Sequence, residues 1–315
     1  MTEAALAVDL GGTDLRVAVV DAAGTVLAFA AEPTPRVGPA AGAGRIATLA
    51  ERVRAEADRP IVGMGIAAPG PIDIPAQVLL GPPTLPGWHD VPLAAMLGER
   101  LGLPVRLEND GNAAALGEWR FGAGRGVSSL VFVTVSTGIG GGVVVDGHLL
   151  HGRRGMAAEI GHMTITGEGE PCFCGAVGCF EAVACGTALG RRAARATTPG
   201  DASTLRRLAG DADPSGRDVI EAARLGDPLA LALVEEEGRW LGVGFTNLLH
   251  LYGPEVVVVG GGISNGLDLL RPAIERTVAA RAMPPYRDIP IAPAQLGRHA
   301  GLAGAASLVL ATTAA

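Results

Sequence analysis

Side chains typical of metal ligands gather between residues 158 and 186, and they are the strongest chemical signal in the chain. One imidazole and three thiols follow the spacing His-x9-Cys-x-Cys-x4-Cys: His162, Cys172, Cys174 and Cys179. Three thiolates and one imidazole form the usual closed tetrahedral shell of a structural Zn²⁺, with no position left for a catalytic water. Gly175 and Gly178 fall inside this spacing, where they let the backbone wrap tightly around an ion. The pattern predicts a zinc site, and the alternative is a group of buried free thiols, because Cys also behaves as a small hydrophobic residue.

Two carboxylates, Glu159 and Glu181, lie at the two ends of this cysteine-rich segment. Carboxylates accept hydrogen bonds from hydroxyl groups. A metal ion that fixes the loop also fixes both carboxylates, so the segment predicts a site for a polyol such as a sugar.

A second polar group is Glu108-Asn109-Asp110-Gly111-Asn112, which stands between an apolar stretch and an alanine-rich one. Polar residues at a strand-to-helix junction are often only N-caps. A cap needs one polar side chain, whereas this stretch has four. If the stretch is catalytic, Asp110 is the natural general base, because its carboxylate can take a proton from a substrate hydroxyl.

Glycine-rich turns form a third group. Residues 4–20 and 130–150 both read as strand, glycine turn, strand, and the two turns carry Thr13 and Thr137. This repetition predicts two similar halves, each with a turn whose N–H groups contact phosphate, although either turn alone is equally typical of an ordinary hairpin. Gly260 to Gly262 follow another apolar strand, which fits either a flat ligand close to the backbone or a tight turn.

Composition limits the class of protein. A length of 315 residues suits two domains, and the net charge of -7 argues against a nucleic-acid partner. The chain shows neither a signal peptide nor an apolar run of about eighteen residues, so we expect no export and no membrane span. It contains no lysine, which excludes a Walker-type phosphate loop and a Schiff-base mechanism. Four cysteines, three of them in the predicted zinc site, indicate a reducing cytoplasm.

Hydrophobic periodicity predicts the elements that position these groups. Beyond the two glycine-turn hairpins, strands are predicted at 25–30, 61–68, 105–108 and 255–259. Helices are predicted at 46–57, 92–101, 113–119, 187–196, 219–225, 229–251 and 300–310. Loops are predicted at 36–44, 81–88 and 197–218, the second of them on the surface.

Five of these motifs together resemble the ROK family (repressors, open reading frames and sugar kinases), in the right order and over essentially the whole chain. They are DLGGT at 9–13, ENDGN at 108–112, STGIGGG at 136–142, EIGH at 159–162 and CFCGAVGCFE at 172–181. The resemblance implies a two-domain α/β fold of the actin-like, ribonuclease H-like and hexokinase type, with a structural zinc loop, that closes over a sugar and ATP. We expect a small domain formed by residues 1–118 plus 298–315 and a large domain formed by residues 119–297.

The resemblance also implies roles for individual residues. The catalytic base would be Asp110, and the sugar would be bound by Gly70, Thr84, Asn109, Asp110, Glu159, His162 and Glu181, so that His162 serves both sugar and metal. Asp9 would lie on the Mg²⁺ side of the phosphates. ATP would be bound by Gly11, Gly12, Thr13, Thr137, Gly138 and Gly261. This chain departs from many family glucokinases at Thr84, where they have Asn.

The expected activity is that of an ATP- and Mg²⁺-dependent hexose kinase, a glucokinase that makes glucose 6-phosphate. An N-acetylmannosamine kinase is the nearest alternative, favoured by Thr84 and by the Val-Ser-Thr-Gly form of the second turn. A sugar-responsive repressor would carry a DNA-binding domain ahead of the first glycine turn, and here that hairpin begins by Leu6. A polyphosphate-dependent kinase is disfavoured because such relatives generally lack the cysteine motif. The expected partners are a hexose and ATP in a homodimer or homotetramer, without nucleic acid or membrane.

Overall fold

The computed structural model describes residues 3–35, 38–198 and 202–310, and the chain divides into two compact units. The first consists of Met1–Ser128, Gly142–Ala158 and Ala294–Ala315, and the second of Ser129–Gly141 and Glu159–Pro293. The chain therefore passes between the units several times. Gly142–Ala158 lies in the first unit, whereas the predicted bounds assigned it to the large domain.

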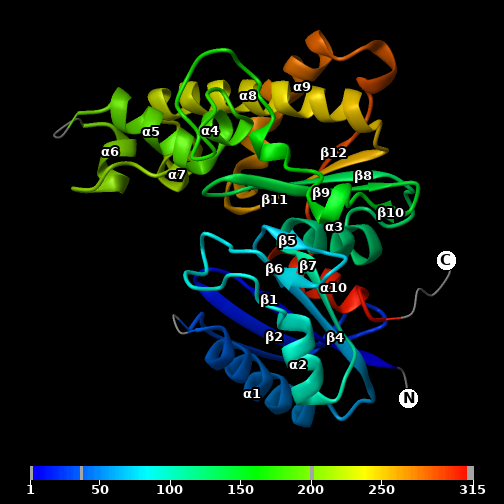
Figure 1. Cartoon of the computed structure of the whole chain (residues 1–315). Helices are drawn as coiled ribbons and strands as arrows, with labels where there is room; N and C mark the ends of the chain where they lie inside the picture. The colour runs from blue at the N-terminus through cyan, green and yellow to red at the C-terminus, as the bar shows by residue number, and fades with distance from the viewer. Residues whose placement is uncertain (1–2, 36–37, 199–201, 311–315) are drawn as a thin grey trace. The chain divides into compact units, whose positions relative to one another are not determined.

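The first unit is built on a five-stranded sheet with the order β3-β2-β1-β4-β7 (Figure 1). Its strands are β1 (Ala4–Leu10), β2 (Asp14–Asp21), β3 (Val26–Pro33), β4 (Ile61–Ala68) and β7 (Val105–Asn109). The first three strands pair antiparallel, and β4 and β7 continue the sheet parallel to β1. The predicted hairpin at 4–20 and the three predicted strands are confirmed.

Helices cover both faces of this sheet, which explains why β1 is apolar along nearly its whole length. On one face, Leu6 and Val8 of β1 share a core with α1 (Pro39–Ala57) and α2 (Leu93–Leu101). On the other face, Ala5 and Ala7 pack with α10 (Ala300–Ser307), which also contacts α3 (Asp110–Phe121). α3 and α10 approach so closely that a Cβ atom at Gly304 would lie 1.6 Å from the Ala113 carbonyl oxygen.

Two loop predictions in this unit need correction. The loop predicted at 36–44 is wrong from Pro39 onward, because Pro39 begins α1 at a position where proline costs no hydrogen bond; residues 36 and 37 lie outside the described residues. The predicted surface loop at 81–88 has no regular structure, but Leu85 and Trp88 are buried in the core. The short elements of this unit are β5 (Ile72–Asp73), β6 (Val78–Leu79), β10 (His148–Leu149), η1 (Arg153–Gly155) and η5 (Gly297–His299).

The second unit contains most of a sheet with the order β10-β9-β8-β11-β12. Its strands are β8 (Leu130–Val135), β9 (Ile139–Val145), β11 (Val256–Gly260) and β12 (Ile291–Pro293), and β11 pairs parallel with β8 and β12. β10 and the part of β9 from Gly142 onward belong to the first unit. The strand, glycine turn and strand predicted within residues 130–150 are confirmed as β8 and β9, and β10 pairs antiparallel with β9 after a second turn.

Helices of the second unit pack mainly around α8 (Pro228–Tyr252), which begins at an Asp227 N-cap. The others are α4 (Phe180–Ala184), α5 (Gly186–Ala196), α6 (Thr204–Ala209), α7 (Gly216–Arg224) and α9 (Leu267–Arg281), with short turns η2 (Ile160–His162), η3 (Gly262–Gly266) and η4 (Pro284–Tyr286). α6 interrupts the loop predicted at 197–218, of which residues 199–201 lie outside the described residues. Among the described residues, we find no helix of the length and apolarity that a membrane span requires.

Candidate active site

The predicted metal ligands converge in the second unit. The ligand atoms of His162, Cys172, Cys174 and Cys179 all lie within 4.8 Å of one another. The sulfur atoms of Cys174 and Cys179 are 3.7 Å apart, and Cys172 Sγ is 3.5 Å from His162 Nδ1. Tetrahedral zinc with bonds of about 2.3 Å to sulfur and about 2.0–2.1 Å to nitrogen gives edges of about 3.8 Å and about 3.5 Å. These four residues therefore fit a structural Zn²⁺.

Backbone turns hold the cysteines in this arrangement. The Cys172 N–H donates to the Ala176 carbonyl at 2.8 Å, and the Gly175 N–H donates back to the Cys172 carbonyl at 3.0 Å. Gly178 has a φ of +75°, and a Cβ atom there would lie 2.0 Å from the Thr166 carbonyl oxygen. The Thr166 backbone therefore lies too close to residue 178 for any side chain, which agrees with the predicted need for glycine within the cysteine spacing.

Glu181 connects the metal cluster to the second glycine turn. It lies in the first turn of α4, where Oε1 is 3.2 Å from Cys172 Sγ and 3.7 Å from His162 Nδ1. A Cβ atom at Gly138 would lie 2.8 Å from Glu181 Oε2. The other predicted carboxylate, Glu159, is exposed at the start of η2, and its carbonyl accepts the His162 N–H at 3.0 Å.

In the first unit, the junction of β7 and α3 carries the predicted base. Asn109 is the N-cap, since its Oδ1 accepts the N–H groups of Gly111 at 2.9 Å and Asn112 at 3.2 Å. The capping alternative is therefore correct for Asn109. Asp110 is the exposed first residue of α3, and its Oδ1 accepts the Gly111 N–H at 2.8 Å. Gly70 adjoins this junction, because a Cβ atom there would lie 3.4 Å from Asn109 Nδ2.

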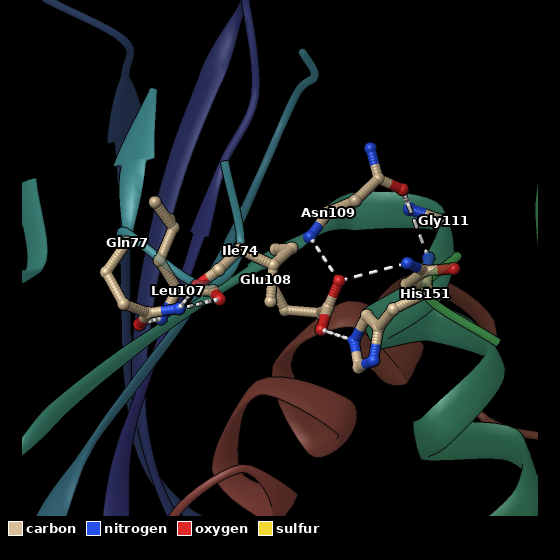
Figure 2. Close-up of polar contacts among 8 residues, drawn as sticks. Ile74, Gln77, Leu107, Glu108, Asn109, Gly111 and His151 are labelled. Atoms are coloured by element: carbon tan, nitrogen blue, oxygen red, sulfur yellow. Dashed lines mark hydrogen bonds and ion pairs between the residues drawn. The ribbon is translucent and has the colours of Figure 1, made fainter. Parts of the chain in front are cut away.

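Behind the junction lies a hydrogen-bond network that the sequence did not reveal (Figure 2). Glu108 is only 2% exposed, and its Oε1 accepts the Asn109 N–H at 2.9 Å and Asn112 Nδ2 at 3.0 Å. Its Oε2 is 2.6 Å from His151 Nε2. This hydrogen bond raises the pKa of His151 above its usual value, against the opposing effect of burial. No local pattern pointed to His151, because it stands 43 residues from its partner.

The turn between β1 and β2, where phosphate binding is predicted, is closely packed. The Gly11 carbonyl accepts Thr34 Oγ1 at 2.6 Å, while Thr13 is exposed. A Cβ atom at Gly12 would lie 2.7 Å from Thr84 Cβ, so Thr84 packs directly on the turn. Gly12, Thr13 and Thr84 line a pocket of about 350 Å³.

Asp9 and the predicted base lie on the same edge of the first sheet. Asp9 pairs with Ala67 of β4, and Ala67 pairs with Glu108 of β7. The backbone positions of Asp9 and Glu108 are therefore two strand spacings apart, a distance of about 9–10 Å. Asp9 Oδ2 accepts Arg16 Nη1 at 3.1 Å; burial raises the pKa of Asp9, and Arg16 opposes the shift.

The second glycine turn borders a larger pocket, of about 550 Å³, within the second unit. Thr137 is exposed at its edge, where its carbonyl accepts Thr187 Oγ1 at 2.7 Å. Gly262 and Ile263 also line the pocket. Gly261 precedes them with a φ of +88°, and a Cβ atom there would lie 2.3 Å from the Val135 carbonyl oxygen. This size and the mixed polar and apolar lining suit a nucleotide.

Comparison with known proteins places these motifs in one family, because residues 5–312 match the ROK family. The chain belongs to the ROK family. It is 39% identical to a glucokinase of Streptomyces coelicolor over 312 residues, 96% of each chain. The crystal structure of a ROK hexokinase from Thermus thermophilus superposes with a TM-score of 0.81 at 38% identity, covering 96% of each chain. A ROK family glucokinase from Streptomyces griseus in complex with glucose and AMPPNP has a TM-score of 0.79 at 37% identity, covering 97% of this chain and 99% of that one.

The predicted family and the α/β hexokinase-type fold are thus confirmed. The predicted site residues fall into two sets. The first unit holds Asp9, Gly11, Gly12, Thr13, Gly70, Thr84, Asn109 and Asp110. The second holds Thr137, Gly138, Glu159, His162, Glu181 and Gly261, with the three cysteines of the metal cluster.

Proposed function

We propose that this ROK protein is an ATP-dependent hexose kinase that converts glucose and ATP to glucose 6-phosphate and ADP. The observation that carries the proposal is the shared sheet edge of the first unit, where a glycine turn and Asp9 stand two strands from Asn109 and Asp110. Phosphoryl transfer requires such proximity between phosphate-holding groups and a base. The ROK glucokinase of Streptomyces griseus, which binds glucose and AMPPNP, supports the same assignment.

In the proposed reaction, Asp110 accepts the proton of the sugar's 6-hydroxyl as that oxygen attacks the γ-phosphorus of ATP. The bond between the γ-phosphorus and the bridging oxygen breaks, and ADP leaves with the electron pair. Backbone N–H groups of the turns at Gly11 to Thr13 and at Thr137 and Gly138 hold the phosphates. Asp9 would offer an oxygen ligand for Mg²⁺, which would supply positive charge beside the transferring phosphoryl.

Each unit contains candidate sugar ligands. Asn109, Asp110, Gly70 and Thr84 belong to the first unit, and Glu159, His162 and Glu181 to the second. Carboxylates accept hydrogen bonds but donate none, so Glu159 and Glu181 suit adjacent free hydroxyls of a pyranose. The larger pocket beside Thr137 and Gly262 is the proposed site of adenosine, with Gly261 required by its close backbone contact.

We further propose that the His162 and cysteine cluster holds one structural Zn²⁺. The two ligand separations of 3.7 and 3.5 Å support this assignment. Zinc would fix the loop against which Glu181 lies and thereby orient a sugar ligand. A cytoplasmic location, where ATP and reduced thiols occur together, and a homodimeric or homotetrameric state complete the proposal.

One observation favours a different sugar. Thr84 occupies the pocket beside Gly12, and a threonine leaves more room than the Asn found in many family glucokinases. That room suits the acetamido group of N-acetylmannosamine. ADP release measured with glucose, mannose, fructose, N-acetylglucosamine and N-acetylmannosamine tests both assignments, and we expect glucose to be the best substrate. The absence of ADP release with every sugar would refute the kinase assignment.

A further inference from the structure

We propose that His151 is a positioning residue for phosphoryl transfer, acting through Glu108 to hold the backbone on both sides of Asp110. This inference rests on the proposed kinase function, in which Asp110 is the base. It assigns a role to a histidine that lies outside every motif identified in the sequence.

The first step is the position of Glu108. Its Oε1 bonds the Asn109 N–H at 2.9 Å and Asn112 Nδ2 at 3.0 Å, and these two residues precede and follow Asp110 in the chain (Figure 2). Asn109 is also the N-cap of α3, so its placement determines where the helix begins. Any rotation of the Glu108 side chain would therefore disturb the backbone that carries the base.

The second step is what keeps Glu108 from rotating. Its side chain is only 3% exposed, whereas that of His151 is 39% exposed. Glu108 Oε2 lies 2.6 Å from His151 Nε2, which is within hydrogen-bond distance, and a hydrogen bond to an ionised carboxylate is stronger than one between neutral groups. A buried carboxylate oxygen without a partner costs the full desolvation of that group. Removing His151 would therefore favour rotation of Glu108 toward water and break its bonds to Asn109 and Asn112.

The third step is the segment that carries His151. A second anchor follows three residues later, where Arg154 Nε donates to Asp73 Oδ2 at 2.8 Å and the Arg154 carbonyl accepts the Ile74 N–H at 3.1 Å. The Ala157 N–H also donates to the His151 carbonyl at 3.0 Å. The segment is thus held independently of Glu108, so the imidazole is presented to the carboxylate by a fixed backbone.

The test compares His151→Ala, His151→Gln and the control His148→Ala in steady-state assays of glucose phosphorylation. We expect His151→Ala to lower kcat about ten-fold while changing KM for ATP less than about two-fold, because the residues that shift, Asn109 and Asp110, are assigned to the sugar and the proton rather than to ATP. His151→Gln keeps an N–H donor for Glu108 Oε2 and should recover kcat to within about three-fold of wild type. His148 is exposed on the same segment, and its Nδ1 lies 2.7 Å from the Asp146 carbonyl oxygen, so His148→Ala should match wild type.

A second measurement does not depend on turnover. Hydrogen exchange followed by mass spectrometry should show faster exchange in peptides covering residues 105–116 in His151→Ala, by about ten-fold, but not in His148→Ala. If wild-type protein phosphorylates no hexose, the proposed function fails, and this exchange measurement still decides whether His151 holds the junction.

Three results would overturn the inference: kcat of His151→Ala within about two-fold of wild type, equal impairment of the Ala and Gln variants, or unchanged exchange at residues 105–116. If His151→Ala does not fold, the Glu108→Gln and His151→Gln variants replace it. Their effects on kcat should then be non-additive in the double variant, because both act on one hydrogen bond. Additive effects would refute the coupling.

Discussion

The metal cluster allows a sharp test because the chain has a cysteine outside it. Cys174 is exposed and belongs to the cluster, whereas Cys185 is buried, does not belong to it, and accepts the Ala188 N–H at the start of α5. Serine can replace the capping sulfur of Cys185 but is a poor zinc ligand. Cys174→Ser and Cys185→Ser therefore apply the same chemical change inside and outside the predicted zinc shell.

The expected magnitude follows from the number of ligands. Structural Zn²⁺ binds with about 10–16 kcal/mol in small zinc domains, so one of four ligands contributes about 2.5–4 kcal/mol if they share equally. That loss weakens zinc binding by roughly 10²–10³-fold. The loop from residue 163 to 179 should then lose its order, and Glu181, whose Oε1 is 3.2 Å from Cys172 Sγ, should lose its fixed position.

The assay is elemental analysis of each protein after gel filtration with a chelator, together with thermal unfolding and KM for glucose. We expect about one zinc per chain in wild type and in Cys185→Ser. Cys174→Ser should contain well under one, melt at a lower temperature and show a raised KM for glucose. Wild-type protein without zinc, or Cys174→Ser with a full zinc complement, would refute the reasoning.

Three other predictions concern single side chains. Asp110→Asn should lower kcat by about 10²-fold or more with a far smaller change in sugar affinity, and turnover within about ten-fold of wild type would remove Asp110 from its role. Arg192→Met should lower the free energy of unfolding, measured by urea titration, by about 3–5 kcal/mol, because it leaves the fully buried Glu237 without its cation. A loss below about 1 kcal/mol would contradict this prediction. The pKa of His151 is raised in the folded protein. The pairing of His151 with Glu108 therefore stabilises the fold fully at a pH below the unfolded-state pKa of His151, near 6.5, and this stabilisation is lost as pH rises through its folded-state pKa. The unfolding free energy of wild type relative to His151→Gln should therefore fall as pH rises above about 6.5, and a flat difference would count against the pair.

Much of the site was predictable because its chemistry depends on local spacing. The cysteines and His162 lie within eighteen positions or so, and short spacing restricts which side chains can converge. The glycine turns were also predictable, because two apolar runs that flank Gly11 and Gly12 are a local hairpin signal that does not depend on distant parts of the chain. Gly178 was likewise expected, and its contact with the Thr166 carbonyl explains the need for glycine.

Features that depend on distant partners were not predictable. Glu108 and His151 meet only because the chain returns to the first unit at residues 142–158, and no periodicity signals that return. Trp88 was predicted on the surface from the prolines around it, but the tertiary core buries its ring. Helix α1 begins at Pro39 because proline suits the first turn of a helix, although the Pro- and Gly-rich composition there resembled a loop.

The central claim is tested most directly by measuring kcat/KM for glucose and for N-acetylmannosamine side by side, with ATP as phosphoryl donor. A site whose carboxylates Glu159 and Glu181 bind free hydroxyls is left with unpaired polar groups when an acetamido group replaces one of them. We therefore expect kcat/KM for glucose to exceed that for N-acetylmannosamine by at least about 100-fold. A preference for N-acetylmannosamine would contradict the glucokinase assignment, and no ADP release with either sugar or with the other hexoses tested would contradict the kinase assignment itself.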